Sequence, residues 1–387
     1  MSDQPRFLSY GRQNIDQTDI DAVVAVLRSD FLTQGPEVER FEQALAAATG
    51  ARFAIAYSHG TAALFGACFA AGVQAGDEVI TSPITFAASA NCAAYLGAKP
   101  VFADVEPLMV TLDPDAFERA ITPRTKAVIP VHFAGQPVQL EEISAIARKH
   151  GLTVIEDAAH ALGARYHGKP IGGTGLSDMA ILSFHPVKHI TTGEGGAVTT
   201  DDPQLADRLR RFRNHGIERD PSRFTIPSPG PWYHEMQDLG HNFRLTDLQA
   251  ALGRSQLQRL PAFVARRQAI AVLYERLLAG VAGVKTLGHL PDTENSYHLM
   301  VLRIDFAGLG RDRAQVMDAL RARQIGSQVH YIPCYRHPYH AAAGWQPADF
   351  PNAEAFYAQA LSLPMYPDLS DADVARVVLA LQEVLHG

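Results

Sequence analysis

The chain has 387 residues, of which 47% are hydrophobic and 19% are charged, and its formal net charge is -7. This length exceeds one ordinary hydrophobic core, so a globular protein with two domains is expected. The acidic balance argues against a general nucleic-acid or membrane surface. The first fifteen residues, MSDQPRFLSYGRQNI, lack the apolar core of a signal peptide, and no apolar stretch is long enough to span a bilayer.

The cysteines and histidines do not suggest a metal site. Cys68, Cys92 and Cys334 lack metal-ligand spacing, and their small number favours a reducing compartment, so we expect a cytoplasmic protein. The 16 histidines show no paired spacing on a helix, and no metal site is predicted.

From about Tyr57 to Thr200, short apolar runs alternate with helix-like stretches. The predicted strands are Glu78–Thr85, Pro100–Val105, Ala127–His132, Thr153–Glu156, Met179–Phe184 and Ala197–Thr200. The predicted helices between them include Thr61–Ala71, Ala87–Leu96, Asp113–Ile121 and Leu140–His150. This alternation predicts an α/β fold with a mostly parallel sheet covered on both faces.

Past Gly216 the alternation stops. A proline- and serine-rich loop at 220–232 precedes a long helical stretch from Thr246 to about Leu278, interrupted at Pro261. The remaining residues predict a smaller α+β region with strands His298–Ile304 and Ser327–Tyr331 and helices Arg311–Arg323, Ala353–Ala360 and Asp371–Leu385. We therefore expect a large domain at 15–245 and a small domain at 246–387, which begins with an interdomain helix at about 246–278.

The most informative residues are Lys188 and Asp157, each of which follows or ends a predicted buried strand. Carboxyl ends of neighbouring parallel strands meet at one edge of a sheet, where ligands bind. A lysine in an apolar, glycine-flanked setting can serve as an amine nucleophile, and a nearby aspartate can keep a pyridinium nitrogen protonated. Either residue alone has a plainer interpretation, as a solvated charge or a helix cap. Together they predict a pyridoxal phosphate (PLP) site, with Lys188 as its Schiff-base lysine.

Further candidates could complete a cofactor site. Gly60 and Thr61 open a helix whose first N–H groups favour phosphate, although the same turn could be a plain helix cap. Ser183 could reach the same phosphate. Phe86 could stack on a flat ring or belong to the core, and His160 could bond a ring hydroxyl or be a core histidine.

Several of these stretches resemble the DegT/DnrJ/EryC1/StrS family of sugar-nucleotide aminotransferases. The likeness is carried by Leu32–Pro36, Ser58–Thr61, Glu156–His160, Ser183–Gly196 and Leu239–Arg244, and it extends from about Tyr10 to Pro333. It implies the fold-type I, aspartate aminotransferase-like architecture. The Lys188 block, the Tyr10 segment and Val329–Pro333 are most similar to the branch that acts in pseudaminic acid biosynthesis.

The resemblance implies a role for each matching residue. Lys188 would carry the cofactor and shuttle protons, and Asp157 would bond the pyridine nitrogen. His160 would stand near the ring hydroxyl and Phe86 on the ring, while Gly60, Thr61 and Ser183 would hold the phosphate. Asn242 would reach that phosphate from the other subunit of a homodimer with shared active sites. The residues implied near the sugar are Tyr10, His330 and Tyr331.

The implied reaction moves an amino group from L-glutamate to C4 of a UDP-linked 4-keto-6-deoxy sugar, or of another UDP- or dTDP-linked 4-keto sugar. Lys188 argues against the family's dehydratases, which have histidine there. Cys334 is a weak candidate for the nucleophile of a desulfurase, and no basic helix-turn-helix segment precedes residue 10 to suggest a transcription regulator. One departure from the family is His189, where we expect proline, and an imidazole there could alter the sugar pocket.

Overall fold

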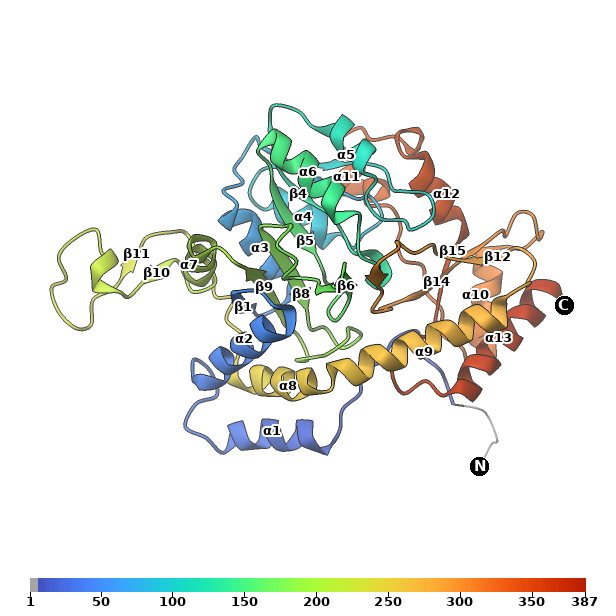
Figure 1. Ribbon diagram of the computed structural model, residues 1–387, viewed down its shortest axis with the longest axis horizontal. Helices are drawn as coiled ribbons and strands as arrows, with labels where there is room; N and C mark the ends of the chain where they lie inside the picture. Colours follow the sequence, from blue (N-terminus) through green and yellow to red (C-terminus); the bar gives the residue numbers. More distant parts are fainter. Residues whose placement is uncertain (1–5) are drawn as a thin grey trace.

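The computed structural model describes residues 6–387 and is built around a seven-stranded sheet (Figure 1). In spatial order its strands are β1 (Phe53–Tyr57), β9 (Gly196–Thr200), β8 (Met179–Ser183), β5 (Thr153–Asp157), β4 (Thr125–Ile129), β2 (Glu78–Thr81) and β3 (Lys99–Phe102). β9 runs antiparallel to its neighbours β1 and β8, and the other neighbouring pairs are parallel. The predicted mostly parallel sheet is confirmed, with one reversed strand that the sequence pattern did not reveal.

Helices cover both faces of this sheet because alternate strand residues point to opposite sides. In β5, Val154 belongs to a core shared with α2 (Pro36–Thr49), α5 (Pro114–Ala120), α6 (Leu140–His150) and α8 (Asp247–Gln258). The next residue, Ile155, belongs to a core shared with α3 (Gly60–Ala70), α4 (Ala88–Ala94) and α7 (Pro203–Phe212). The sheet is therefore buried on both sides, and ligands can reach it only at the ends of its strands.

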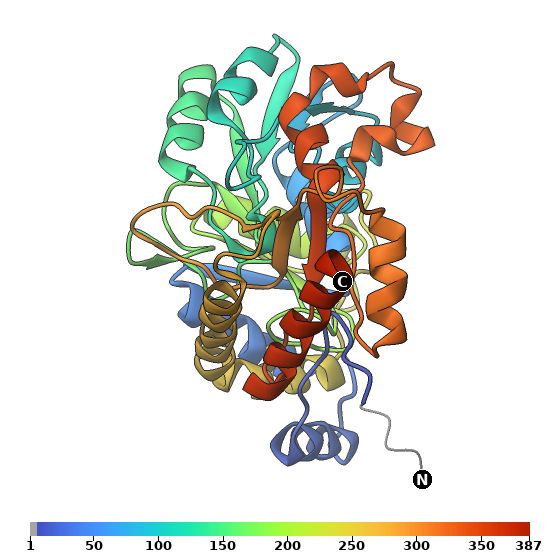
Figure 2. The same ribbon diagram turned by 90° about the vertical axis from the view of Figure 1, so that its right-hand side faces the viewer.

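The C-terminal part has a smaller antiparallel sheet in the order β12 (Val284–Thr286), β14 (Met300–Ile304), β15 (Ala360–Leu363). Three helices share its core: α9 (Leu260–Leu278), α10 (Arg313–Ala322) and α13 (Asp371–His386). Figure 2 looks onto this part, with α13 in front and α9 and α10 on either side of it. The predicted break at Pro261 is confirmed, since α8 ends at Gln258 and Pro261 lies in the first turn of α9.

The remaining elements lie around these two sheets. α1 (Gln17–Leu27) packs beside α8, and α11 (Pro338–Ala341) and α12 (Pro351–Gln359) follow in the C-terminal part. A small sheet pairs β13 (Thr293–Glu294) with β6 (Arg165–Tyr166), which also pairs with β7 (Lys169–Pro170). The hairpin of β10 (Ile217–Glu218) and β11 (Glu235–Met236) projects away from the rest of the chain (Figure 1). Within residues 6–387, no helix is long and apolar enough to cross a membrane.

Two strand predictions need correction. Ser327–Tyr331 is not a strand, because only Gln328 makes a ladder contact, to Ser362. The strand expected to reach Thr85 ends at Thr81, and the apolar residues after it are buried instead against the C-terminal part, where Cys334 N–H donates to Pro83 O. Apolar patterns record burial, and here the burial comes from tertiary packing rather than from a sheet.

Several elements of the structure are missing from the sequence-based expectation, among them α1, α2, α7 and β1. In α1 the buried residues are Asp19 and Val26, so its apolar stripe is too narrow to give a helical period. In α7 the buried residues are Ala206, Leu209 and Phe212 among several arginines. Short amphipathic elements of this kind depend on their neighbours for stability, and a pattern in the sequence alone does not reveal them.

Candidate functional site

Asp157 and Lys188 lie at the same edge of the large sheet. Asp157 is the last residue of β5, and Lys188 lies in the turn that follows β8, the parallel neighbour of β5. The turn is closed by a hydrogen bond of 2.9 Å from Lys188 N–H to His185 O. The carboxyl ends of these two strands therefore bring a carboxylate and an amine to one place, as the sequence predicted.

Asp157 is buried and held by two hydrogen bonds. Ser89 Oγ donates to Oδ2 at 2.6 Å, and Ala159 N–H donates to Oδ1 at 3.1 Å. A second hydroxyl, Thr85 Oγ1, is 2.7 Å from Ser89 Oγ. The carboxylate is thus fixed in one orientation while each oxygen keeps a lone pair for a cationic partner. Sequence reasoning missed Ser89 and Thr85, whose only signal is a pair of hydroxyls four residues apart beside Phe86.

Lys188 is in a setting that favours its neutral amine. Burial lowers the pKa of Lys188 to about 8, the nearby Asp157 carboxylate opposes this shift, and the Arg267 guanidinium adds to it. Its Nζ atom is 3.4 Å from Nε2 of His298, another residue that sequence reasoning missed. At pH 7 about a tenth of Lys188 is then unprotonated, far more than for an ordinary lysine, and able to act as a nucleophile or a base.

Gly60 and Ser183 face each other across a short gap. Gly60 opens α3, and a Cβ at this position would lie 3.2 Å from Ser183 Cβ and 3.3 Å from its Oγ. The helix is capped by His59, whose Nδ1 accepts from Ala62 N–H at 3.0 Å. This cap leaves the N–H groups of Gly60 and Thr61 without an intrahelical partner, next to the Ser183 hydroxyl, which is a suitable arrangement for an anion.

Phe86, Tyr331 and His160 form one side of the site. Phe86 is an apolar side chain with 63% of its surface exposed, and its ring centroid is 6.3 Å from that of Tyr331. Tyr331 Oη lies 3.1 Å from His160 Nε2. Burial, followed by the charge of Lys188, lowers the pKa of His160 well below its ordinary value, so this imidazole is neutral.

These residues fit a bound PLP. The exposed ring of Phe86 offers a surface for a flat heterocycle, and Nδ1 of His160 is buried without a hydrogen-bond partner among the described residues. The absence of a Cβ at Gly60 keeps open the space beside Ser183 Oγ that a phosphate needs. Together with a lysine of lowered pKa, they match the chemistry of the group: a phosphate, an aromatic ring and an aldehyde.

Tyr10 and His330 lie together beside this cluster. Their ring centroids are 5.4 Å apart, and His330 Nδ1 is 2.8 Å from Ser362 Oγ. Burial and the charge of Lys188 lower the pKa of His330 to about 3. His330 and Tyr331 are consecutive, so this irregular segment brings both of them to the site.

Asn242 has no direct contact with this cluster. Its side chain is exposed, and its backbone forms an isolated bridge with Asn214. The adjacent Phe243 accepts a hydrogen bond of 2.8 Å from Ser58 N–H through its carbonyl, close to the turn that opens α3.

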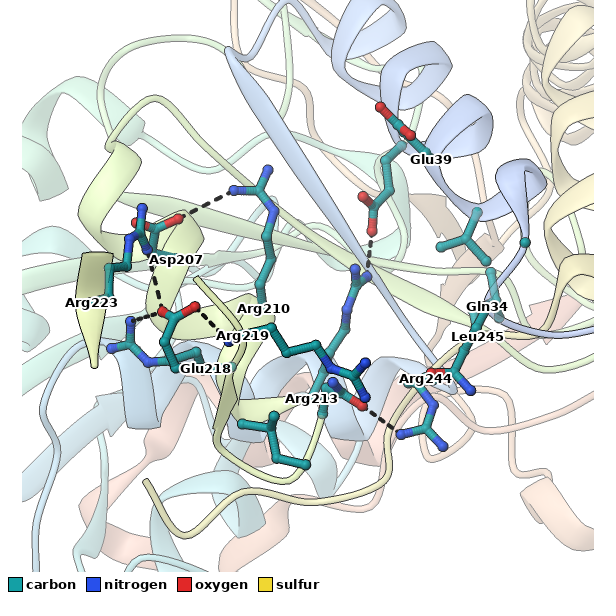
Figure 3. A pocket seen from close by; sticks show the side chains of 16 residues that line it. Gln34, Glu39, Asp207, Arg210, Arg213, Glu218, Arg219, Arg223, Arg244 and Leu245 are labelled. Carbon is teal, nitrogen blue, oxygen red and sulfur yellow. Dashed lines mark hydrogen bonds and ion pairs between the residues drawn. The ribbon is translucent and has the colours of Figure 1, made fainter. Parts of the chain in front are cut away.

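A cavity of about 410 Å³ lies away from Lys188, between α2, α7 and the start of the β10–β11 hairpin (Figure 3). Several arginines line it, and most have a partner in the chain. Arg213 pairs with Glu42 and also donates to Ala56 O at 2.7 Å. Arg223 is 2.8 Å from Asp207. Of Arg213, Arg219 and Arg223, only Arg219 has no ion pair within residues 6–387.

His189 is buried and faces the C-terminal part of the chain. Its Nε2 is 3.1 Å from the carbonyl oxygen of Ser296, and its ring centroid is 5.8 Å from that of His298. The imidazole therefore packs between the two parts of the chain. Beside it, sequence reasoning missed Arg267, a fully buried charge on the apolar face of α9, where its position among Phe263, Val264, Ile270 and Ala271 was the signal.

Comparison with known proteins agrees with this geometry. Residues 13–382 match the model of the DegT/DnrJ/EryC1/StrS aminotransferase family. The spore coat polysaccharide biosynthesis protein SpsC of Bacillus subtilis is 43% identical over 98% of both chains. Among solved structures, Helicobacter pylori PseC, an aminotransferase of pseudaminic acid biosynthesis, is 32% identical with a TM-score of 0.91 and covers 98% of this chain and 99% of its own.

Two further structures bear on the chemistry. DesI, solved in the presence of its TDP-sugar product, is 34% identical with a TM-score of 0.87 and covers 100% of this chain and 94% of its own. Spr1654 of Streptococcus pneumoniae, a proposed sugar aminotransferase solved in its PLP form, is 29% identical with a TM-score of 0.90 and covers 98% of both chains. The chain therefore belongs to the DegT/DnrJ/EryC1/StrS family and is a PLP-dependent sugar-nucleotide aminotransferase.

Proposed function

We propose that the chain transfers the amino group of L-glutamate to C4 of UDP-2-acetamido-2,6-dideoxy-β-L-arabino-hex-4-ulose, in pseudaminic acid biosynthesis. The product is UDP-4-amino-4,6-dideoxy-N-acetyl-β-L-altrosamine. The observation that carries the amine chemistry is a half-buried lysine, with its pKa lowered to about 8, beside a fixed carboxylate. The proposed identity of the sugar rests on the likeness of the Lys188 block to the pseudaminic acid branch of the family and on the similarity to PseC along the whole chain.

In this proposal PLP, when bound, withdraws electrons from the carbon that gains or loses the amino group. Lys188 holds the cofactor and then, as a free amine, moves a proton between the two reacting carbons. Asp157 keeps the ring nitrogen protonated because Ser89 and Ala159 fix its carboxylate.

The other residues bind and orient. Gly60, Thr61 and Ser183 hold the phosphate, Phe86 packs on the ring, and the neutral His160 lies near the ring hydroxyl. Tyr10, His330 and Tyr331 contact the sugar. Arg219, which has no ion pair among the described residues, is a candidate for the pyrophosphate of the nucleotide.

We also propose a homodimer in which Asn242 completes the phosphate site of the other subunit. Its support is the exposed Asn242 side chain, together with two exposed apolar residues in the segment before it, Trp232 at 74% and Leu239 at 80%. The three cysteines are all buried and free, which favours a reducing compartment. Since glutamate is the proposed amino donor as well, we propose that the enzyme acts in the cytoplasm.

A second candidate is amination of another UDP- or dTDP-linked 4-keto-6-deoxy sugar for a surface polysaccharide. SpsC, a spore coat polysaccharide biosynthesis protein, is more similar in sequence than PseC, which favours keeping this alternative. The two candidates differ in the configuration of the keto sugar that the site accepts.

Kinetic comparison of epimers separates the two candidates. We expect kcat/KM for the UDP-linked L-arabino 4-keto sugar to exceed that for the D-xylo epimer by at least about tenfold, because a site built for one epimer leaves polar groups unpaired with the other. Product formation with glutamate would be followed by mass spectrometry, with dTDP-linked sugars in parallel. A clear preference for the D-xylo sugar, or for a dTDP sugar, would favour the second candidate.

A further inference from the structure

His298 lies directly beside Lys188, although 110 positions separate them in the chain. Its ring is buried and stands against His160 with ring centroids 4.3 Å apart, and its Nε2 is 3.4 Å from Lys188 Nζ. We propose that His298 is a positioning residue, which accepts a hydrogen bond from Lys188 Nζ through Nε2 and holds the free amine in one orientation.

The main chain that carries His298 is held from two sides. Arg267 Nη1 donates to the carbonyl oxygens of Tyr297 and His298, both at 3.2 Å. Ser296 Oγ donates to His160 O at 3.2 Å, and Ser296 N–H donates to the carbonyl of Gly135 at 3.2 Å. The imidazole therefore has a fixed place relative to the large sheet, although it belongs to the segment just before β14.

The surroundings keep His298 neutral and able to accept a hydrogen bond. Burial first, then the nearby charge of Lys188, lowers the pKa of His298 well below its ordinary value. The charged and titratable groups around Lys188 are Asp157, His160, His189, Arg267, His298 and His330. A neutral imidazole has one acceptor nitrogen, so acceptance at Nε2 places the hydrogen on Nδ1.

Holding the lysine in one orientation benefits the reaction because the lysine side chain is flexible. A free lysine amine on its four-carbon stem has many rotamers. A hydrogen bond that restricts these rotamers before proton transfer lowers the entropic cost of that step. A histidine acceptor from the C-terminal part also makes the amine's position depend on how that part sits against the sheet. This inference rests on the proposed role of Lys188.

The pKa of Lys188 tests the hydrogen bond directly in protein freed of PLP. The pH dependence of Lys188 acetylation by acetic anhydride would be read from its peptide by mass spectrometry. The bond stabilises the ammonium form, so His298→Leu should lower the pKa of Lys188 by about 0.5 to 1 unit. His298→Gln, whose amide oxygen can accept, should recover most of that shift.

His340→Gln is the matched control for loss of a buried histidine. His340 is buried, but its Nε2 lies 3.0 Å from Asn91 Oδ1, away from Lys188, so the pKa of Lys188 should not change. An unchanged pKa in His298→Leu would overturn the proposal. Equal shifts in His298→Leu and His298→Gln would also overturn it, because ring volume rather than the acceptor would then be responsible.

A second measurement uses the unmodified chain and so does not depend on a variant folding. In protein freed of PLP and labelled with ¹⁵N-histidine, the ring nitrogen shifts of His298 should show the hydrogen on Nδ1, and the Nε2 signal should move as Lys188 titrates near pH 8. A hydrogen on Nε2 would overturn the proposal. Neither result bears on whether Lys188 is essential, which the activity of Lys188→Ala decides separately.

Discussion

At the scale of single residues, the proposed chemistry depends on Lys188. Lys188→Ala should abolish transamination, lowering kcat by at least about a thousandfold, and remove the visible absorbance of lysine-bound PLP, because the variant lacks the amine that holds the cofactor and moves the proton. The thermal midpoint should change little. Turnover of the keto sugar, cofactor absorbance and circular dichroism would be measured beside Lys285→Ala, in which an exposed lysine of β12 is removed. An active Lys188→Ala enzyme that keeps the absorbance band would refute the assignment.

At the scale of elements, the contact between the start of α3 and the end of β8 should set the affinity for PLP. Gly60→Ala would place a Cβ 3.3 Å from Ser183 Oγ, so the hydroxyl must move, and we expect PLP to bind about tenfold more weakly. On the same helix, Gly66→Ala would place a Cβ 2.5 Å from Tyr57 Oη in the core, which should lower the thermal midpoint and leave PLP affinity nearly unchanged. Fluorescence titration and thermal melts would measure both. Equal PLP affinity in Gly60→Ala and the parent would show that this turn does not bind the phosphate.

At the scale of the whole molecule, shared active sites predict complementation between two inactive variants. A hybrid of a Lys188→Ala subunit and an Asn242→Ala subunit has one site with both Lys188 and Asn242, because these residues come from different chains. Random mixing should therefore restore about a quarter of the parent activity, since about half of the dimers are hybrids with one working site each. Activity after refolding the mixture would be compared with each variant refolded alone. No recovery would place Asn242 in the site of its own subunit, and a fully active monomer by sedimentation would refute the shared site.

The sequence by itself determined the order of strands and helices around the site and the meeting of Asp157 with Lys188. Both are local properties: an apolar run makes a strand, and parallel strands place their carboxyl ends at one edge. The division into domains at about residue 245 stays a prediction. Only the tertiary structure shows that Ser89 donates a hydrogen bond to Asp157 and that His298 lies beside Lys188. It alone also shows that Arg267 is buried in the core and that Arg213 forms an ion pair with Glu42. Each of these depends on which surfaces of distant elements pack together, and polar pairing across such long separations leaves no periodic signal in the sequence.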